Sequence, residues 1–141
     1  MRYIAAANIS PRGVTMNFTQ AISSGFSNYV NFAGRAIRSE YWYWVLFVII
    51  ASIVTSIIDL VLDIRVFEPL FSLAVLLPSI AVGVRRLHDL DRSGWWLLLG
   101  FIPLIGAIVL IVWYCGRGTP GANRFGPDPL GAIGLRPSPA V

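Results

Sequence analysis

The sequence has few of the side chains on which enzyme chemistry depends. It contains no lysine, one histidine and one cysteine in 141 residues, and only 13% of its residues are charged. A lysine Schiff base and a lysine-containing phosphate loop are therefore excluded, and one cysteine forms neither an intramolecular disulfide nor a metal cluster. A carboxylate site for Mg²⁺ or Ca²⁺ stays open on composition alone. We expect no catalytic residue, no metal ligand and no cofactor.

The apolar residues lie in long blocks. They make up 56% of the chain, against about 45–50% in an average soluble domain. Residues 41–62, 66–84 and 94–116 are nearly free of charge. Because about 20 apolar residues cross the hydrocarbon layer as a helix, we expect three hydrophobic helical segments, with a kink in the second at Pro78. Tryptophans near the block ends are expected to anchor them at the membrane interface: Trp42, Trp44, Trp95, Trp96 and Trp113.

The remaining segments complete an all-α integral membrane protein. Apolar residues recur at helical spacing over residues 18–33. This pattern predicts an interfacial helix or, equally well, a helix packed on the rest of the protein. The membrane domain is expected over residues 17–130, after an N-terminal extension at residues 1–16, and Met16 competes with Met1 as the native start. A tail rich in glycine and proline should be irregular, with disorder over residues 131–141.

Arginines set the expected orientation, because basic residues accumulate on the cytoplasmic side of a membrane. Arg35 and Arg38 precede the first block, and three more arginines lie in the stretch at residues 85–92. We therefore expect a multi-pass protein with a cytoplasmic N-terminus. Two alternatives stay open for the third block. A full span kinked at Pro103 puts the tail outside, whereas a re-entrant segment that bends at residues 102–106 keeps the tail arginines inside.

Residues 85–92 form the densest polar stretch of the chain. If the second helix continues to Arg92, then Arg85, Asp89 and Arg92 share one face. The guanidinium groups either bind lipid phosphates or an acidic partner, or belong to a solvated turn that only enforces topology. His88 and Asp89 are helix neighbours that point about 100° apart, so they form no acid–base pair. Because the arginines flank apolar blocks and form no continuous basic stripe, we expect no nucleic-acid binding.

Asp59 is the one acid inside the first hydrophobic block. Acids in such an environment are functional candidates by default. Its place near the end of the block also lets it reach water or pair with Arg65. Asp59 therefore leaves an alternative open, in which the chain is a subunit of a small oligomeric transporter or channel.

Three patches together resemble a known family. They are residues 34–42, residues 85–89 with 92–96, and residues 118–121 with 123–129. In this order and spacing they resemble the bacterial inner-membrane family named domain of unknown function 805, over about residues 18–130. The resemblance implies a small protein of the bacterial inner membrane, with no established reaction or ligand. Its signature residues map to Gly34, Arg35, Arg38, Glu40, Trp42, Arg85, Arg86, His88, Asp89, Arg92, Gly94, Trp95, Asn123, Arg124, Phe125, Gly126 and Asp128.

If the three patches form one site, they lie on one side of the membrane. We then expect its arginines to pair with its acids, that is, Arg35, Arg38, Arg85 and Arg86 with Glu40, Asp89 and Asp128. The expected ion-pair or structural residues are Glu40, Asp59 and Asp128. The leading hypothesis is a non-enzymatic binding or assembly module whose basic cytoplasmic face engages anionic lipid, a partner membrane protein or a second copy of the chain. The candidate residues for lipid or partner contact are Arg35, Arg38, Arg85, Arg86, His88, Asp89, Arg92 and Arg124.

Overall fold

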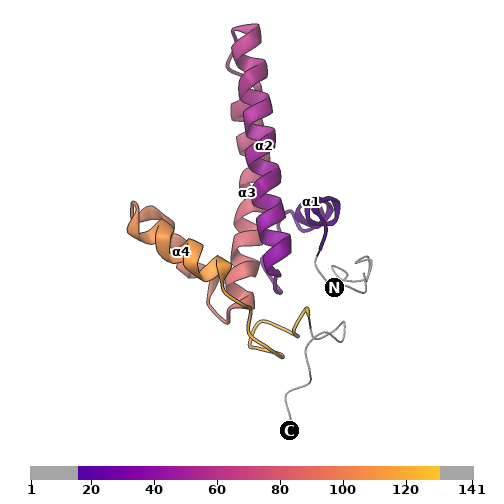
Figure 1. Ribbon diagram of the computed structural model, residues 1–141, viewed down its shortest axis with the longest axis vertical. Coiled ribbons are helices and arrows are strands. Elements are labelled where there is room, and N and C mark those ends of the chain that lie inside the picture. Colours follow the sequence, from indigo (N-terminus) through magenta and orange to yellow (C-terminus); the bar gives the residue numbers. More distant parts are fainter. Residues whose placement is uncertain (1–15, 131–141) are drawn as a thin grey trace.

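The structure, a computed structural model, describes residues 16–130 (Figure 1). Within that range it is all-helical, with five helices and no named strand: α1 (Phe18–Ser27), α2 (Arg38–Leu62), α3 (Phe67–Asp89), η1 (Gly94–Phe101) and α4 (Ile105–Cys115). The all-α class is therefore confirmed for the described part of the chain. The expected disordered tail, and the expected N-terminal extension apart from Met16, fall outside the described residues.

Helices α2 and α3 form a long hairpin and run side by side in Figure 1. Both are long and apolar enough to cross a membrane, and only 6% of the most apolar 18-residue window of α2 is buried. A helix of 25 residues is about 37 Å long at 1.5 Å per residue. An apolar surface of this extent is far larger than a soluble monomer exposes to water. Such a surface is typical of a helix that faces hydrocarbon, so α2 and α3 are candidate membrane-spanning helices.

Helix α1 lies against the lower end of α2 in Figure 1. It begins with a capping box in which the Asn17 side chain accepts from the backbone N–H of Gln20 and the Gln20 side chain accepts from that of Asn17. It ends at Ser27, earlier than the predicted residue 33, because the Asn28 side chain donates to the Ser24 carbonyl. A Cβ at Gly25 would lie 2.2 Å from the ring of Trp44. Glycine is therefore needed for this close approach, and α1 packs on the hairpin, which leaves its interfacial location a prediction.

The tryptophans expected as interface anchors have different environments. Trp44 is a core residue with 1% of its surface exposed, and its Nε1 donates to Ser79 Oγ at 3.1 Å. This corrects the expectation for Trp44, which faces α1 and α3 instead of lipid. Trp95 and Trp96 are exposed, while Trp42 and Trp113 are half-buried. The anchoring role of these four stays a prediction.

The turn between α2 and α3 is held by Asp59. Its two carboxylate oxygens accept from the backbone N–H groups of Phe67 and Glu68, each at 3.0 Å. These amides open α3 and have no partner within that helix. Asp59 therefore caps a helix that follows it in the chain, and no ion pair joins it to Arg65 among the described residues.

Helix α3 extends further than the second block predicted. It begins at Phe67 and runs without a break through Pro78 to Asp89. The expected range was residues 66–84, so the helix is five residues longer at its C-terminal end. The kink expected at Pro78 stays a prediction. The extra turns carry the polar residues 85–89, so this charged stretch is helical. The helix ends short of Arg92, since Asp91 has a left-handed backbone with φ of 56°.

The third hydrophobic block is not one helix. The 3-10 helix η1 ends at Phe101 and α4 begins at Ile105, with Leu104 at φ 64° in the turn between them. The two arms fold back tightly, because a Cβ on Gly106 would lie 1.6 Å from the carbonyl oxygen of Leu99. Both ends of the block lie at the end of the hairpin where α3 finishes. This is the geometry that the re-entrant alternative requires.

We expect Asp59→Ala to destabilise the hairpin, because it removes both acceptors that cap α3. The unfolding midpoint should fall in mixed detergent–dodecyl sulfate micelles, followed by circular dichroism. The control is Ser56→Ala, one turn away on an exposed part of α2, which should leave the midpoint unchanged. Equal effects of the two substitutions would contradict the capping role.

Candidate functional site

The candidate site is a pair of buried arginine networks where α2 begins and α3 ends. In the first, Arg85 Nη1 donates to Glu40 Oε1 at 2.7 Å. The same oxygen accepts from Ser24 Oγ at 2.7 Å. One residue from each of α1, α2 and α3 thus meets at one carboxylate, which fixes these three helices relative to one another.

In the second network, Asp89 is shared by two arginines. Its Oδ1 accepts from Arg35 Nε at 3.0 Å, and its Oδ2 accepts from Arg86 Nη1 at 2.5 Å. Arg35 comes from the segment before α2, whereas Arg86 precedes Asp89 by one turn of α3. Asp89 therefore pairs with Arg86 and not with Arg85, which points toward Glu40 instead.

The two guanidinium groups that pair with Asp89 also donate to backbone carbonyl groups, at the end of α4 and in the tail (residues 116–130). Arg35 donates to the carbonyl oxygens of Thr119 at 2.5 Å and Gly121 at 2.7 Å. Arg86 donates to the carbonyl oxygen of Tyr114 at 3.0 Å and to that of Gly116. Carbonyl groups at a helix C-terminus have no partner within the helix. Arg86 therefore satisfies the end of α4 and brings it against α3.

The tail can cover Asp89 because a glycine lets its backbone come close to the carboxylate. A Cβ on Gly118 would lie 2.0 Å from Asp89 Oδ2, and the backbone N–H of Thr119 donates to the Asp89 carbonyl at 2.7 Å. Further along, Asp128 accepts from the backbone N–H of Gly121 at 2.9 Å and lies 4.0 Å from Arg35. The glycine-rich segment is thus an ordered cover over the network.

His88 and Asn123 tie the outer part of this cover to α3. The His88 ring stacks on Phe125 with the ring centroids 4.0 Å apart, and its Nδ1 lies 3.0 Å from the carbonyl oxygen of Gly34. Asn123 donates to the His88 carbonyl at 2.8 Å. The histidine therefore helps to pack the tail against α3.

The two networks are electrically balanced. Three arginines and three acids are buried, each with 6% or less of its surface exposed: Arg35, Arg85, Arg86, Glu40, Asp89 and Asp128. Buried charges are tolerated only when each is paired and hydrogen-bonded. Chemically this arrangement is a clasp that holds α2, α3, α4 and the tail together. Arg85 uses only Nη1, and its Nε and Nη2 are buried without a hydrogen-bond partner. Because all three guanidinium groups are buried, a lipid phosphate has no access to them here.

The remaining cations lie outside the clasp. Arg38, Arg117 and Arg124 are exposed and Arg92 is half-buried. Arg92 lies over the Trp113 ring at 3.9 Å, and Arg124 forms an exposed pair with Asp91 at 3.3 Å. Of the residues expected to contact lipid or a partner, the structure therefore buries Arg35, Arg85, Arg86 and Asp89 and leaves Arg38, Arg92 and Arg124 at the surface.

Several functional contacts had no clear sequence signal. Ser24, the serine that reaches Glu40, lies in the amphipathic segment and looks like any polar residue of its outer face. Gly118 and the carbonyl acceptors of the tail make contacts through the backbone, which a sequence pattern does not encode. The sequence signal for the site was the presence of both arginines and acids in the three patches.

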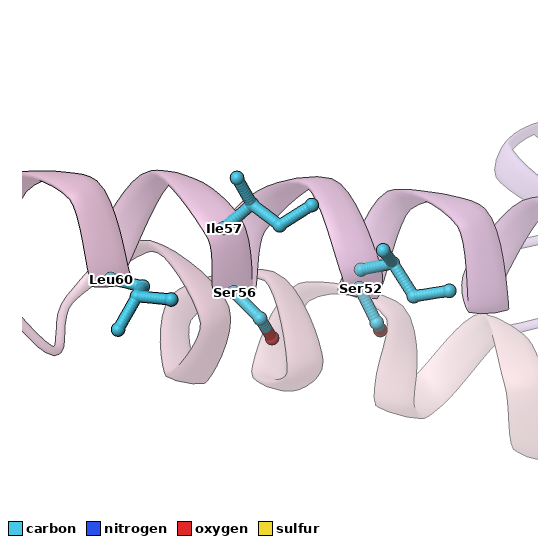
Figure 2. Close-up of a pocket in the computed structure, with 5 residues that line it drawn as sticks. Ser52, Ser56, Ile57 and Leu60 are labelled. Carbon is cyan, nitrogen blue, oxygen red and sulfur yellow. The ribbon is translucent and has the colours of Figure 1, made fainter.

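A hollow on α2 lies away from the clasp and is lined by Ser52, Ile53, Ser56, Ile57 and Leu60 (Figure 2). Ser52 and Ser56 are four residues apart and point the same way in Figure 2. The lining carries no charge, so the hollow offers no group for acid–base chemistry or for holding an ion. Among residues 16–130 no group of three or more histidine, cysteine or acidic side chains is placed to hold a metal.

Comparisons with known proteins point to one family. The family model described as Protein of unknown function (DUF805) matches residues 29–127. The chain is 47% identical over 108 residues to inner membrane protein YhaI of Escherichia coli strain K12, which covers 75% of this chain and 92% of that protein. It is 48% identical over 108 residues to inner membrane protein YhaH of the same strain, covering 72% and 89%. The uncharacterised protein YiiR is 32% identical over 130 residues, covering 70% and 85%. No solved structure matches.

Asp89→Asn should destabilise the protein strongly, because it leaves Arg35 and Arg86 buried with one fewer negative charge. Breaking a buried pair costs about 3–5 kcal/mol. The control is Asp91→Asn, which disrupts an exposed pair worth about 0–1 kcal/mol and suits the left-handed backbone there. The free energy of unfolding in mixed micelles, followed by tryptophan fluorescence, measures both. Similar values for the two variants would refute the clasp.

Proposed function

Because the chain belongs to the family described as Protein of unknown function (DUF805), whose relatives here are inner membrane proteins with no assigned activity, we propose that it is a membrane-embedded binding module. Its basic cytoplasmic face engages anionic phospholipid. The single observation that carries this proposal is the division of its arginines. The buried ones are neutralised by acids, and the exposed ones at the same end of the hairpin form a basic surface.

The charge difference between the two ends of the hairpin supports the proposal. Near the clasp the exposed or half-buried charges are Arg38, Arg92, Arg117 and Arg124 against Asp91 alone. At the other end of the hairpin, the positive charge of Arg65 is outnumbered by the negative charges of Asp63 and Glu68. Basic residues near a membrane collect on the cytoplasmic side, and each adds about 1 kcal/mol of attraction to an anionic leaflet. The clasp end is therefore the one we assign to the cytoplasm.

The same assignment makes the third hydrophobic block a re-entrant segment. Its α4 arm has 11 residues and is roughly 16 Å long, about half of the hydrocarbon thickness. Irregular backbone at that depth requires protein cover, and Gly106 packs directly on the backbone of Leu99. We propose that η1 and α4 dip into the cytoplasmic leaflet and return, so that the tail closes the clasp from the cytoplasm.

The alternative of a transporter or channel subunit depends on Asp59. Both of its carboxylate oxygens accept backbone hydrogen bonds from α3. A carboxylate that is occupied in this way contributes to helix capping, which lowers the support for an ion pathway. The binding module is therefore the function we favour.

The proposed topology predicts the behaviour of reporter fusions. A fluorescent protein that folds only in the cytoplasm should fluoresce when fused after Val141, and alkaline phosphatase at the same site should be inactive. The same reporters fused after Ile64, in the turn between α2 and α3, should give the reverse pattern. Phosphatase activity at Val141 would contradict the re-entrant assignment.

The basic face predicts selective retention of anionic lipid. Native mass spectrometry of the detergent-solubilised protein should show bound phosphatidylglycerol in excess over phosphatidylethanolamine. Replacing Arg92, Arg117 and Arg124 together by Gln should reduce that excess by about 150-fold at most, since each cation contributes about 1 kcal/mol. The control is Arg65→Gln, at the other end of the hairpin, which should retain it. No preference for anionic lipid in the wild-type protein would overturn the proposal.

A further inference from the structure

A groove lies between the start of α2 and the end of α4. It is lined by Arg38, Ser39, Trp42, Tyr43, Leu46 and Cys115. Five of these residues come from consecutive turns of α2, where positions four apart follow one another along the helix. The lining is therefore polar at the N-terminus of α2 and apolar further along the helix.

Arg38 differs from the arginines of the clasp because its charge is not compensated. Its Nη1 donates to the carbonyl oxygen of Cys115 at 2.9 Å, and no carboxylate among residues 16–130 forms an ion pair with it. This corrects the expectation that Arg38 pairs with an acid of the three patches. An exposed guanidinium without a carboxylate partner is available to an anion that comes from outside the chain.

Ser39 adds a second polar contact at the same end of the groove. Its Oγ accepts from the backbone N–H of Met16 at 3.0 Å, so its hydroxyl hydrogen can be donated to an incoming acceptor. The guanidinium of Arg38, which no carboxylate of the described residues engages, lines the same groove. Guanidinium and hydroxyl donors together match the oxygens of a phosphate.

The apolar part of the groove distinguishes a lipid from a soluble phosphate. Trp42 is fixed by the hydrogen bond from its Nε1 to the Tyr114 carbonyl, and Tyr43 and Leu46 continue exposed along the span. An acyl chain that follows these side chains buries apolar surface, whereas a free phosphate gains nothing from them. An amphipathic ligand therefore fits the lining better than a purely polar one.

We propose that this groove binds one anionic glycerophospholipid, with its phosphate on Arg38 and Ser39 and an acyl chain along Tyr43 and Leu46. The inference rests on the proposed function and makes it specific, since it assigns one of the lipids that the basic face attracts to a single groove. Arg38 is then a binding residue and not part of the clasp.

The test uses Cys115, which is the only cysteine of the chain and lines the groove. A maleimide should label it in detergent, since the residue is exposed. Adding phosphatidylglycerol to the micelles should slow the labelling at least about fivefold, the effect of one cation on an anionic lipid. Phosphatidylcholine and inorganic phosphate should not slow it. Equal protection by phosphatidylcholine, or protection by inorganic phosphate, would overturn the assignment to an anionic phospholipid.

The variants locate the effect. Arg38→Gln should abolish protection by phosphatidylglycerol, and Arg38→Lys should restore part of it. The control Arg65→Gln, an exposed arginine at the other end of the hairpin, should keep wild-type protection. Protection of Arg38→Gln at the wild-type level would overturn the proposal. If Arg38→Gln does not fold, the substitute is wild-type protein labelled at Cys115 with a bulky maleimide, which should block the groove. Undiminished retention of phosphatidylglycerol by the labelled protein would also overturn the proposal.

The two proposals fail in distinguishable ways. If the wild-type protein retains phosphatidylglycerol in native mass spectrometry but Cys115 is not protected, the groove assignment is wrong and the basic face still binds lipid. If the protein shows no preference for anionic lipid by either measurement, both proposals are wrong.

Discussion

Burial of charge in balanced numbers is the constraint on which this structure depends. Asp89 is central to this balance, because its carboxylate accepts hydrogen bonds from two buried arginines, Arg35 and Arg86. Removing water from Arg35 and Arg86 is unfavourable, and the loss is offset only when carboxylate and carbonyl oxygens occupy their donors. The carbonyl groups come from the end of α4 and from the tail. The irregular part of the chain therefore takes its shape from the charges that it covers.

The hydrophobic blocks predicted the long helices well, since a stretch of 20 apolar residues has few alternatives to a helix in a membrane. The first block was within three residues of α2. The end of α3 was missed, because a polar sequence such as residues 85–89 gives no periodic apolar signal. The third block was left between two geometries, and the choice depends on contacts of Tyr114 and Gly116 with Arg86 that no local pattern encodes.

The charged patches predicted which residues gather, but not which of them face water. Arg35, Arg85 and Arg86 look the same in sequence as Arg38, Arg92 and Arg124. Their burial is decided by acids and glycines that are distant along the chain, such as Glu40 and Gly118. Trp44 shows the same limitation among the aromatics, since a tryptophan at the start of a span looks like an anchor until α1 is placed against it. Position in three dimensions separates the structural members of each residue type from those available to a ligand.

The tail contacts also constrain the order in which the protein is assembled. Arg35 leaves the ribosome long before Thr119 and Gly121, whose carbonyl oxygens it later binds. Until those two residues have been made, its guanidinium must remain hydrated, so this end of the nascent hairpin stays in contact with water. The two long helices are therefore made first, and residues 119–121, which follow them in the chain, complete the network by displacing water from Arg35.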